Sequence, residues 1–259
     1  MRKKILSVLL SLTMIITMMP AHLFEVSAAT KTKATVSNQS GLNKVVKNKK
    51  LKTLTIKTSK NRTFTIPKGD YKKLTFVINS SKVKINISKK AKVKIIKTIK
   101  KNSNININIA GELSKINIEK KTTLKISGTT SKKIEVDIVK RADKTMVTSK
   151  VKVLVNANSG AVVNLKKGSE NSKVKYTDSK KEVKVINNTA RKITVQNPKG
   201  ELISVLKSET FISSDYEKEQ EKEKEEETEQ HQGSNGGHQQ KDTPPEYERG
   251  SNETEWDFN

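Results

Sequence analysis

The sequence predicts an all-β protein whose folded part is a parallel β-helix, or β-solenoid, of about eight coils with roughly 20 residues each. Three observations carry this prediction. Apolar residues alternate with polar ones, as in SNININI at 103–109, and this is the two-residue period of a strand. Short Asn, Ser, Lys and Gly clusters separate the strands, and they are typical of turns. The strands also recur at a nearly constant spacing.

Residues 1–29 form the first predicted segment, a secretory signal peptide. A basic start is followed by an apolar run from Ile5 to Met19, a proline, and small-residue sites at VSA and SAA. We expect cleavage after Ala28 or Ala29. An uncleaved membrane anchor is the alternative, but the apolar run is shorter than the roughly 20 residues that span a bilayer. The mature chain is therefore expected to be secreted and to contain no membrane span.

Residues 30–50 are polar and basic and are expected to form a lead-in or cap, whereas residues 51–207 carry the repeat. Two interleaved series of strands fill this repeat, and each advances by 17 to 22 residues per step. By its first inward residues, one series is Leu54, Leu74, Ile95, Ile116, Ile134, Val153, Val174 and Ile193. The other is Phe64, Ile85, Ile105, Leu124, Met146, Val163, Val183 and Leu202.

An antiparallel β-sandwich is the alternative fold, because it also contains short strands at regular spacing. The constant step favours the solenoid, since sandwich strands have no reason to keep one loop length throughout. In a solenoid each coil stacks on the previous one, so the inward isoleucines of 103–109 would belong to a continuous apolar column.

The repeat stops near residue 208, and residues 208–259 are interpreted as a disordered, acidic, low-complexity tail whose Glu/Lys run could form a transient helix. Residues 30–207 contain 44 Lys and Arg against 10 Asp and Glu, a net charge of +34, whereas residues 208–259 contain 5 against 16, a net charge of −11. The basic block predicts polyanionic partners. An AT-rich genome is a competing cause, because its codons favour Lys, Asn and Ile.

The residue types exclude several chemistries from the repeat. The chain contains no cysteine, which excludes disulfides, thiol nucleophiles and thiolate metal sites. His22 lies in the signal peptide, and His231 and His238 lie in the tail, so a Ser-His-Asp triad and His-ligated zinc are excluded from residues 51–207. No cofactor is expected.

A column of lysines is the predicted polyanion-binding site. In successive coils a lysine stands directly before the first inward residue, so all of these side chains should point outward from one sheet. Coils stacked about 4.8 Å apart would place like charges side by side, and a bound polyanion would relieve their repulsion. The alternative is a solvated lysine face that resists aggregation. The column comprises Lys73, Lys94, Lys115, Lys133, Lys152, Lys173 and Lys192.

Glu135 and Asp137 in KKIEVDIVK are the candidate catalytic pair for an alternative function. They alternate with inward residues, so both carboxylates should project from one face about 6 to 7 Å apart, a spacing that glycosidases use. The simpler interpretation is that they offset neighbouring lysines such as Lys133 and Lys152. The repeat is also poor in aromatic residues, which sugar-cleaving clefts use for stacking.

The Lys-rich coils, the TFTIPKGDY turn at 63–71 and the signal peptide together resemble uncharacterised secreted β-solenoid repeat proteins of Gram-positive bacteria. The resemblance covers most of residues 50–207 and rests on the style of the repeat. It implies an extracellular surface role and carries over no catalytic residue. In architecture alone, the chain is also similar to right-handed β-helix polysaccharide lyases and hydrolases.

The sequence therefore predicts a secreted, non-enzymatic surface or adhesion module that binds anionic cell-wall polymers or acidic glycans through the lysine column. We expect no specific nucleic-acid partner, and association with the cell surface would be non-covalent. A polysaccharide lyase or hydrolase acting through Glu135 and Asp137 is the second interpretation. A basic module occupied by its own acidic tail is the third.

Overall fold

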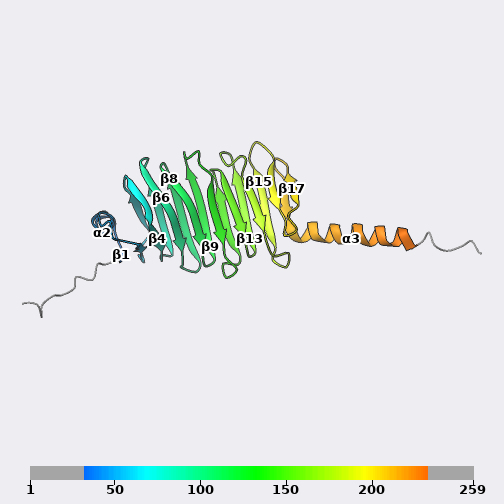
Figure 1. The fold of residues 1–259 in the computed structure, drawn as a ribbon, viewed down its shortest axis with the longest axis horizontal. Coiled ribbons are helices and arrows are strands. Elements are labelled where there is room, and N and C mark those ends of the chain that lie inside the picture. Colours follow the sequence, from blue (N-terminus) through cyan, green and yellow to red (C-terminus); the bar gives the residue numbers. More distant parts are fainter. Residues whose placement is uncertain (1–31, 233–259) are drawn as a thin grey trace, which may run out of the picture. The chain divides into compact units, whose positions relative to one another are not determined.

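The computed structural model describes residues 32–232, which form two stacked β-sheets with a helix near each end of the element order (Figure 1). Sheet A contains, in order across the sheet, β1 (Lys33–Val36), β2 (Thr53–Ile56), β4 (Gly69–Ile78), β6 (Ala91–Thr98), β8 (Glu112–Ile118), β10 (Ile134–Ile138), β12 (Val153–Ala157), β14 (Lys173–Tyr176), β16 (Ile193–Gln196) and β17 (Leu202–Val205). Sheet B contains β3 (Arg62–Ile66), β5 (Lys82–Ile87), β7 (Ser103–Ile109), β9 (Thr122–Gly128), β11 (Thr145–Ser149), β13 (Ala161–Lys166), β15 (Val183–Asn188) and β18 (Thr210–Ile212).

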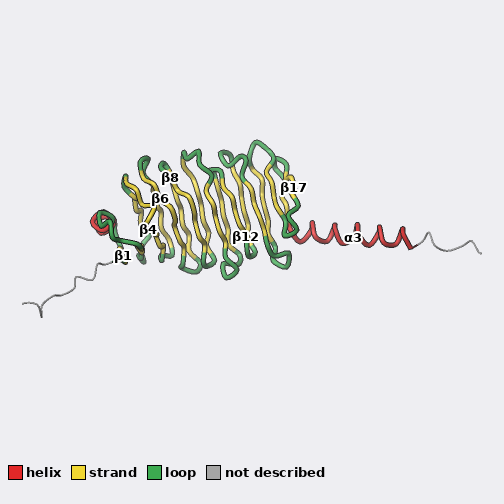
Figure 2. Tube along the Cα trace, in the orientation of Figure 1, coloured by secondary structure: helices red, strands yellow, loops and turns green. Residues whose placement is uncertain are grey.

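The chain passes from one sheet to the other after each strand from β2 to β15, so one coil comprises a strand of each sheet and two turns. Figure 2 shows these turns along the two edges of the strand stack. Neighbouring strands pair in parallel from β1 to β16 in sheet A and from β3 to β15 in sheet B. This parallel pairing confirms the β-solenoid and excludes the antiparallel sandwich.

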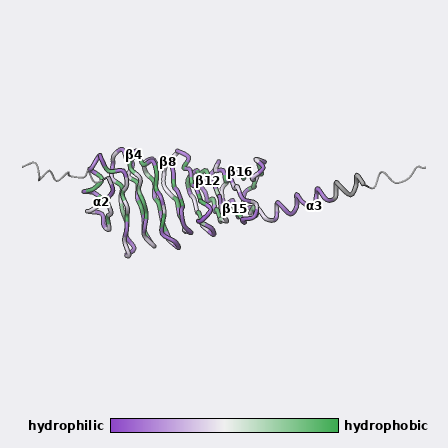
Figure 3. The backbone as a smooth tube through the Cα atoms, turned by 60° about the horizontal axis from the view of Figure 1, so that its bottom comes forward, coloured by the Kyte–Doolittle hydropathy of each residue, from purple (hydrophilic) through white to green (hydrophobic). Residues whose placement is uncertain are grey.

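The core consists of apolar columns that run from coil to coil between the two sheets. In sheet A, Leu54 lies opposite Phe76 and Phe76 opposite Ile96, and all three side chains are buried. In sheet B, the isoleucines of 103–109 are buried while the asparagines between them face outward. Figure 3 shows the same alternation of hydrophobic and hydrophilic residues along the strands. Each fully buried Ile or Leu contributes about 1.5 to 3 kcal/mol, so these columns supply the main stabilising term.

The expectation that Ile95 faces inward is wrong. Ile96 is fully buried, whereas Ile95 is half-buried on the outer side. The register between β4 and β6 shifts between Tyr71 and Thr75, and this irregularity breaks the alternation. Lys94 and Ile95 are consequently adjacent residues that both lie outside the core.

Met146 and Leu202 also lie outside the core, contrary to the expected inward series. Met146 is 49% exposed, and its neighbour Val147 takes the inward position. Leu202 is 64% exposed because it begins β17, an antiparallel strand at the end of sheet A, rather than a further strand of sheet B. Apolar character alone therefore did not indicate which residue of each strand is inward.

Buried hydroxyl groups form hydrogen bonds with backbone groups where the chain turns between the sheets. Thr122 Oγ1 donates to Lys120 O over 2.8 Å and lies 3.0 Å from Ser103 Oγ in the preceding coil. Thr145 Oγ1 in the next coil donates to Ala142 O over 2.6 Å. Because buried backbone polar groups need partners, Ser and Thr recur at these turn positions.

β1 and helix α2 (Gln39–Val45) contact the strands of the first coil and lie within the segment 30–50, the expected lead-in or cap. The side-chain amide of Gln39 donates to Thr65 O over 2.9 Å, and its oxygen accepts from Thr65 N over 2.7 Å. Gln39 thus occupies backbone groups of β3, the first strand of sheet B. Because these groups of the edge strand are occupied, a strand of another chain cannot pair with them.

The last coil is covered by β17 and β18, which both pair antiparallel to the strands before them. Tyr176, Phe211 and Tyr216 pack as an aromatic cluster with ring centroids about 6 Å apart. The Tyr176 hydroxyl donates to Glu217 Oε1 over 3.1 Å. Burial is the main cause that raises the pKa of Tyr176, and this hydrogen bond raises it further. Paired structure therefore continues past the expected boundary at 207.

Helix α3 (Ser213–Gln232) follows β18 and contains most of the Glu/Lys run. Its residues from 218 onward belong to a second compact unit. Within residues 32–232, no helix is long and apolar enough to cross a membrane. The predicted signal peptide at 1–29 and residues 233–259 of the predicted tail lie outside the described residues.

Candidate anion-binding surfaces

The seven lysines of the predicted column lie in different settings. Lys73, Lys94 and Lys115 lie within β4, β6 and β8, Lys173 begins β14, and Lys133, Lys152 and Lys192 end the turns before β10, β12 and β16. None of the seven is buried.

The pairing register does not align these lysines in one column. Lys115 lies opposite Ile95 on one side and Glu135 on the other. Lys173 lies opposite Leu154. The prediction of a single column on one sheet is therefore wrong, because the turns between the sheets differ in length and the shift in β4 displaces the register. The polyanion-binding role of the individual lysines stays a prediction.

Lys115 is held by the two carboxylates that form the candidate catalytic pair. Its Nζ lies 3.2 Å from Glu135 Oε1 and 2.6 Å from Asp137 Oδ2. Asn156 Nδ2 donates to the same two carboxylates, over 3.1 Å to Glu135 and 2.7 Å to Asp137. The hydrogen bond to Asp137 is the main contact that raises the pKa of Lys115. The four side chains thus form a closed polar cluster on the outer face of sheet A.

The expectation that Glu135 and Asp137 offset Lys133 and Lys152 is also wrong, because their lysine partner is Lys115 in the preceding coil. Neither carboxylate lines any of the grooves described below. Their activity as an acid and a base stays a prediction without support from the shape of the surface.

The remaining strand carboxylates also gather around sheet A. Glu112 Oε2 lies 2.9 Å from Lys132 Nζ, whose hydrogen bond lowers the pKa of this carboxyl. Glu119 follows β8 and contacts Lys97 over 3.8 Å and Arg141 over 2.5 Å. The outer side of sheet A consequently has mixed charge, with its acidic groups next to basic ones.

The outer face of sheet B has a different composition. From β3 to β15, the outward positions of its strands contain no Asp or Glu. We call this surface the sheet-B face. Its lysines are Lys82, Lys84, Lys125, Lys150, Lys166 and Lys184, with Lys150 directly after β11. Its asparagines are Asn86, Asn104, Asn106, Asn108, Asn164 and Asn188.

Two shallow grooves run across the sheet-B face. One, of about 490 Å³, is lined by Lys84, Lys125, Lys150 and Lys166 together with asparagine, serine and threonine side chains. The other, of about 650 Å³, shares Lys150 and Lys166 with the first and adds Lys167. The shared lysines make the two grooves neighbours on one basic surface that extends over several coils.

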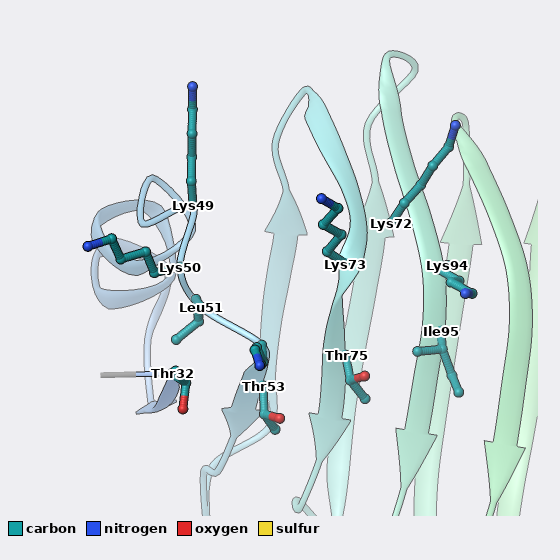
Figure 4. Close-up of a pocket in the computed structure, with 11 residues that line it drawn as sticks. Thr32, Lys49, Lys50, Leu51, Thr53, Lys72, Lys73, Thr75, Lys94 and Ile95 are labelled. Atoms are coloured by element: carbon teal, nitrogen blue, oxygen red, sulfur yellow. The ribbon is translucent and has the colours of Figure 1, made fainter. Parts of the chain in front are cut away.

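A third groove, of about 930 Å³, lies beside the first strands of sheet A, and we call it the N-terminal groove (Figure 4). Lysines from three separate chain segments surround it, and Figure 4 shows Lys73 and Lys94 on neighbouring strands with Lys49 and Lys50 on the loop before β2. Its lysines are Lys49, Lys50, Lys52, Lys72, Lys73 and Lys94. Two members of the predicted column therefore come together here.

Sequence reasoning missed the sheet-B face because it followed lysines in only one strand series. The available signal was the absence of acidic residues from the polar positions of the other series, for example in SNININI. The N-terminal groove had no such signal. It depends on how residues 46–52 fold beside β4, which no local pattern indicates.

A comparison of the chain with protein-family models, curated proteins and solved structures finds no match. Within residues 32–232, no group of three or more His, Cys, Asp or Glu side chains could hold a metal ion.

Proposed function

We propose that the chain is a secreted, non-enzymatic module that binds anionic cell-wall or extracellular polymers through the sheet-B face. The observation that carries this proposal is the lack of any acidic residue at the outward positions from β3 to β15, together with six lysines at those positions and directly after β11. The sheet itself sets the spacing of the charges, since parallel strands lie about 4.8 Å apart.

In the described part of the chain, the sheet-B lysines have no carboxylate next to them, whereas several lysines on or beside sheet A do. Among the described residues, none of them takes part in a salt bridge, whereas Lys97, Lys115 and Lys132 each contact a carboxylate. A polyanion that covers the face would relieve the repulsion among neighbouring ammonium groups and release its own counterions.

The other side chains on the face support a polyanionic rather than a neutral polymer. Asparagine, serine and threonine can exchange hydrogen bonds with hydroxyl groups. The aromatic residues of the solenoid, including Phe64 and Tyr176, are buried or lie at its ends, so the face offers no ring for stacking a neutral sugar. Lysine provides point charges without a fixed fork, so we expect recognition of charge density more than of one repeating unit.

Charge-matched variants of the mature chain test this proposal. The face variant replaces Lys84, Lys125, Lys150 and Lys166 with Gln. A matched control replaces Lys89, Lys120, Lys140 and Lys180, which are exposed turn lysines outside the three grooves. Binding to polygalacturonate and to a glycerol-phosphate polymer is measured over a range of salt concentrations.

We expect the face variant to lose at least about tenfold in affinity and to show a shallower log–log salt slope, because fewer ion contacts form. The control should lose clearly less. Equal losses of affinity in the two variants would contradict the proposal. The lysines would then only make the surface basic and soluble. Comparison of the two polymers distinguishes a carboxylate from a phosphate source of charge.

The same samples check the hydrolase interpretation. Cleavage products that disappear in Glu135→Gln and Asp137→Asn variants would show an enzyme acting through these two residues. Polymer that stays intact while bound agrees with a binding module.

A further inference from the structure

The N-terminal groove lies beside the first half of β4, where the neighbouring strand β2 is too short to pair with it. β4 runs from Gly69 to Ile78, but β2 pairs only with its second half, Thr75–Ile78. Residues 46–52 form the loop that precedes β2. The Thr75 N–H donates to Lys52 O, at the end of this loop, over 2.9 Å. The first half of β4 is therefore flanked by a lysine-bearing loop on one side and β6 on the other, and a hollow of about 930 Å³ remains beside them.

The charges around this hollow are nearly all positive. Six lysines line it, three from the loop, two from β4 and one from β6, and no acidic residue does. Asp70 is the nearby acid, but its Oδ2 lies 3.9 Å from Lys72 Nζ and both side chains are more than half exposed, so this ion pair is weak. At Lys115 in the next coil, by contrast, two carboxylates neutralise the lysine.

We propose that the N-terminal groove is a second anion site, separate from the sheet-B face, and that it binds a compact, sugar-sized group carrying several phosphates. Its volume lies in the range of small-molecule sites. The two sheet-B grooves join each other through Lys150 and Lys166, whereas this groove shares no residue with them. Lysines from three chain segments line it, and their flexible side chains can reach one compact ligand from different sides.

The remaining lining fits such a ligand. Thr32, Thr53 and Thr75 supply hydroxyl donors for phosphate oxygens, and Leu51 and Ile95 supply the apolar part of the wall. The lining contains no aromatic residue that would stack on a base and no carboxylate that would bind a cation. This site does not depend on the proposed polymer binding, because the two surfaces share no lysine.

Titration calorimetry of the mature chain with myo-inositol hexakisphosphate tests the site. The groove variant replaces Lys49, Lys72 and Lys94 with Gln, one lysine from each segment. The control variant makes the same change in charge on the sheet-B face, at Lys125, Lys150 and Lys166. Circular dichroism verifies that both variants are folded.

We expect the wild type to bind the probe in a one-to-one complex, the groove variant to lose at least about tenfold in affinity, and the control to change by less than about threefold. Equal losses would overturn the inference, because net charge alone would then explain binding. A larger loss in the control would place the probe on the sheet-B face, and no binding by the wild type would also overturn it. Tighter binding of myo-inositol hexakissulfate at the same groove would reassign the site to sulfated groups.

Failure of this site and failure of the proposed function are distinguishable. If the groove variant binds the long polymers as the wild type does but loses the compact probe, the two sites are independent. If the groove variant instead loses both ligands, the N-terminal groove is part of the polymer site, and the inference of a second site is wrong.

Discussion

Gly168 shows at the scale of one residue how closely the coils stack. It lies in the turn between β13 and β14 with a φ of +97°, and a Cβ added to it would lie 2.4 Å from Lys150 O in the preceding coil. Gly200, between β16 and β17, has a similar φ of +91°, but a Cβ there would meet only Gln196 Nε2 at 3.8 Å. The two glycines share a left-handed backbone and differ in the space around it.

We expect Gly168→Ala to lower the free energy of unfolding by about 2 to 3 kcal/mol, because it combines left-handed strain with displacement of a stacked turn. Gly200→Ala should cost only about 1 kcal/mol, since strain acts alone there. Urea unfolding followed by circular dichroism measures both. Similar losses would show that the turn can move away from Lys150 without cost.

At the scale of the element, the register defines which residues make up one interchangeable coil. Ile116 lies opposite Val136, so residues 116–135 correspond to one full step of sheet A. Neighbouring coils contact each other mainly through their paired strands, which is the property that makes repeat proteins tolerant of whole-unit deletion.

Deletion of residues 116–135 should leave a cooperatively unfolding β protein of lower stability, because Val136 takes the inward place of Ile116. Deletion of 116–134 is the control. It puts Glu135 in that place, and a shift by one residue reverses the inward and outward faces of the strand. Denaturant titrations followed by circular dichroism compare the two. Loss of cooperative unfolding in the 20-residue deletion, or its retention in the 19-residue one, would contradict the register.

The strands and their stacking could be predicted from the sequence, whereas the exact register could not. Alternation predicted the strands, and the constant step predicted their stacking, because both follow from the two-residue period and the size of one coil. Alternation could not separate Ile95 from Ile96, since adjacent isoleucines fit either face. The shift between Tyr71 and Thr75 that decides between them is a property of the pairing and leaves no local pattern in the sequence.

At the scale of the whole molecule, the distribution of charge between the two sheets matters more than the net charge. The sequence showed a basic block and predicted a polyanionic partner, but it did not show where the ten acidic residues of 30–207 would gather. Pairing places the strand acids on sheet A, where Lys115 lies between Glu135 and Asp137, and leaves the sheet-B face without them. Residues 218–259 carry a net charge of the opposite sign, and the described part of this segment belongs to a separate unit.

The central claim is that the sheet-B face is where an anionic polymer binds, and lysine acetylation footprinting by mass spectrometry tests it most directly. The mature chain is acetylated briefly with and without polygalacturonate or a glycerol-phosphate polymer. We expect the polymer to protect Lys84, Lys125, Lys150 and Lys166 and to leave the turn lysine Lys140 reactive. Protection spread evenly over all exposed lysines, or concentrated at Lys133, Lys152 and Lys192, would contradict the account.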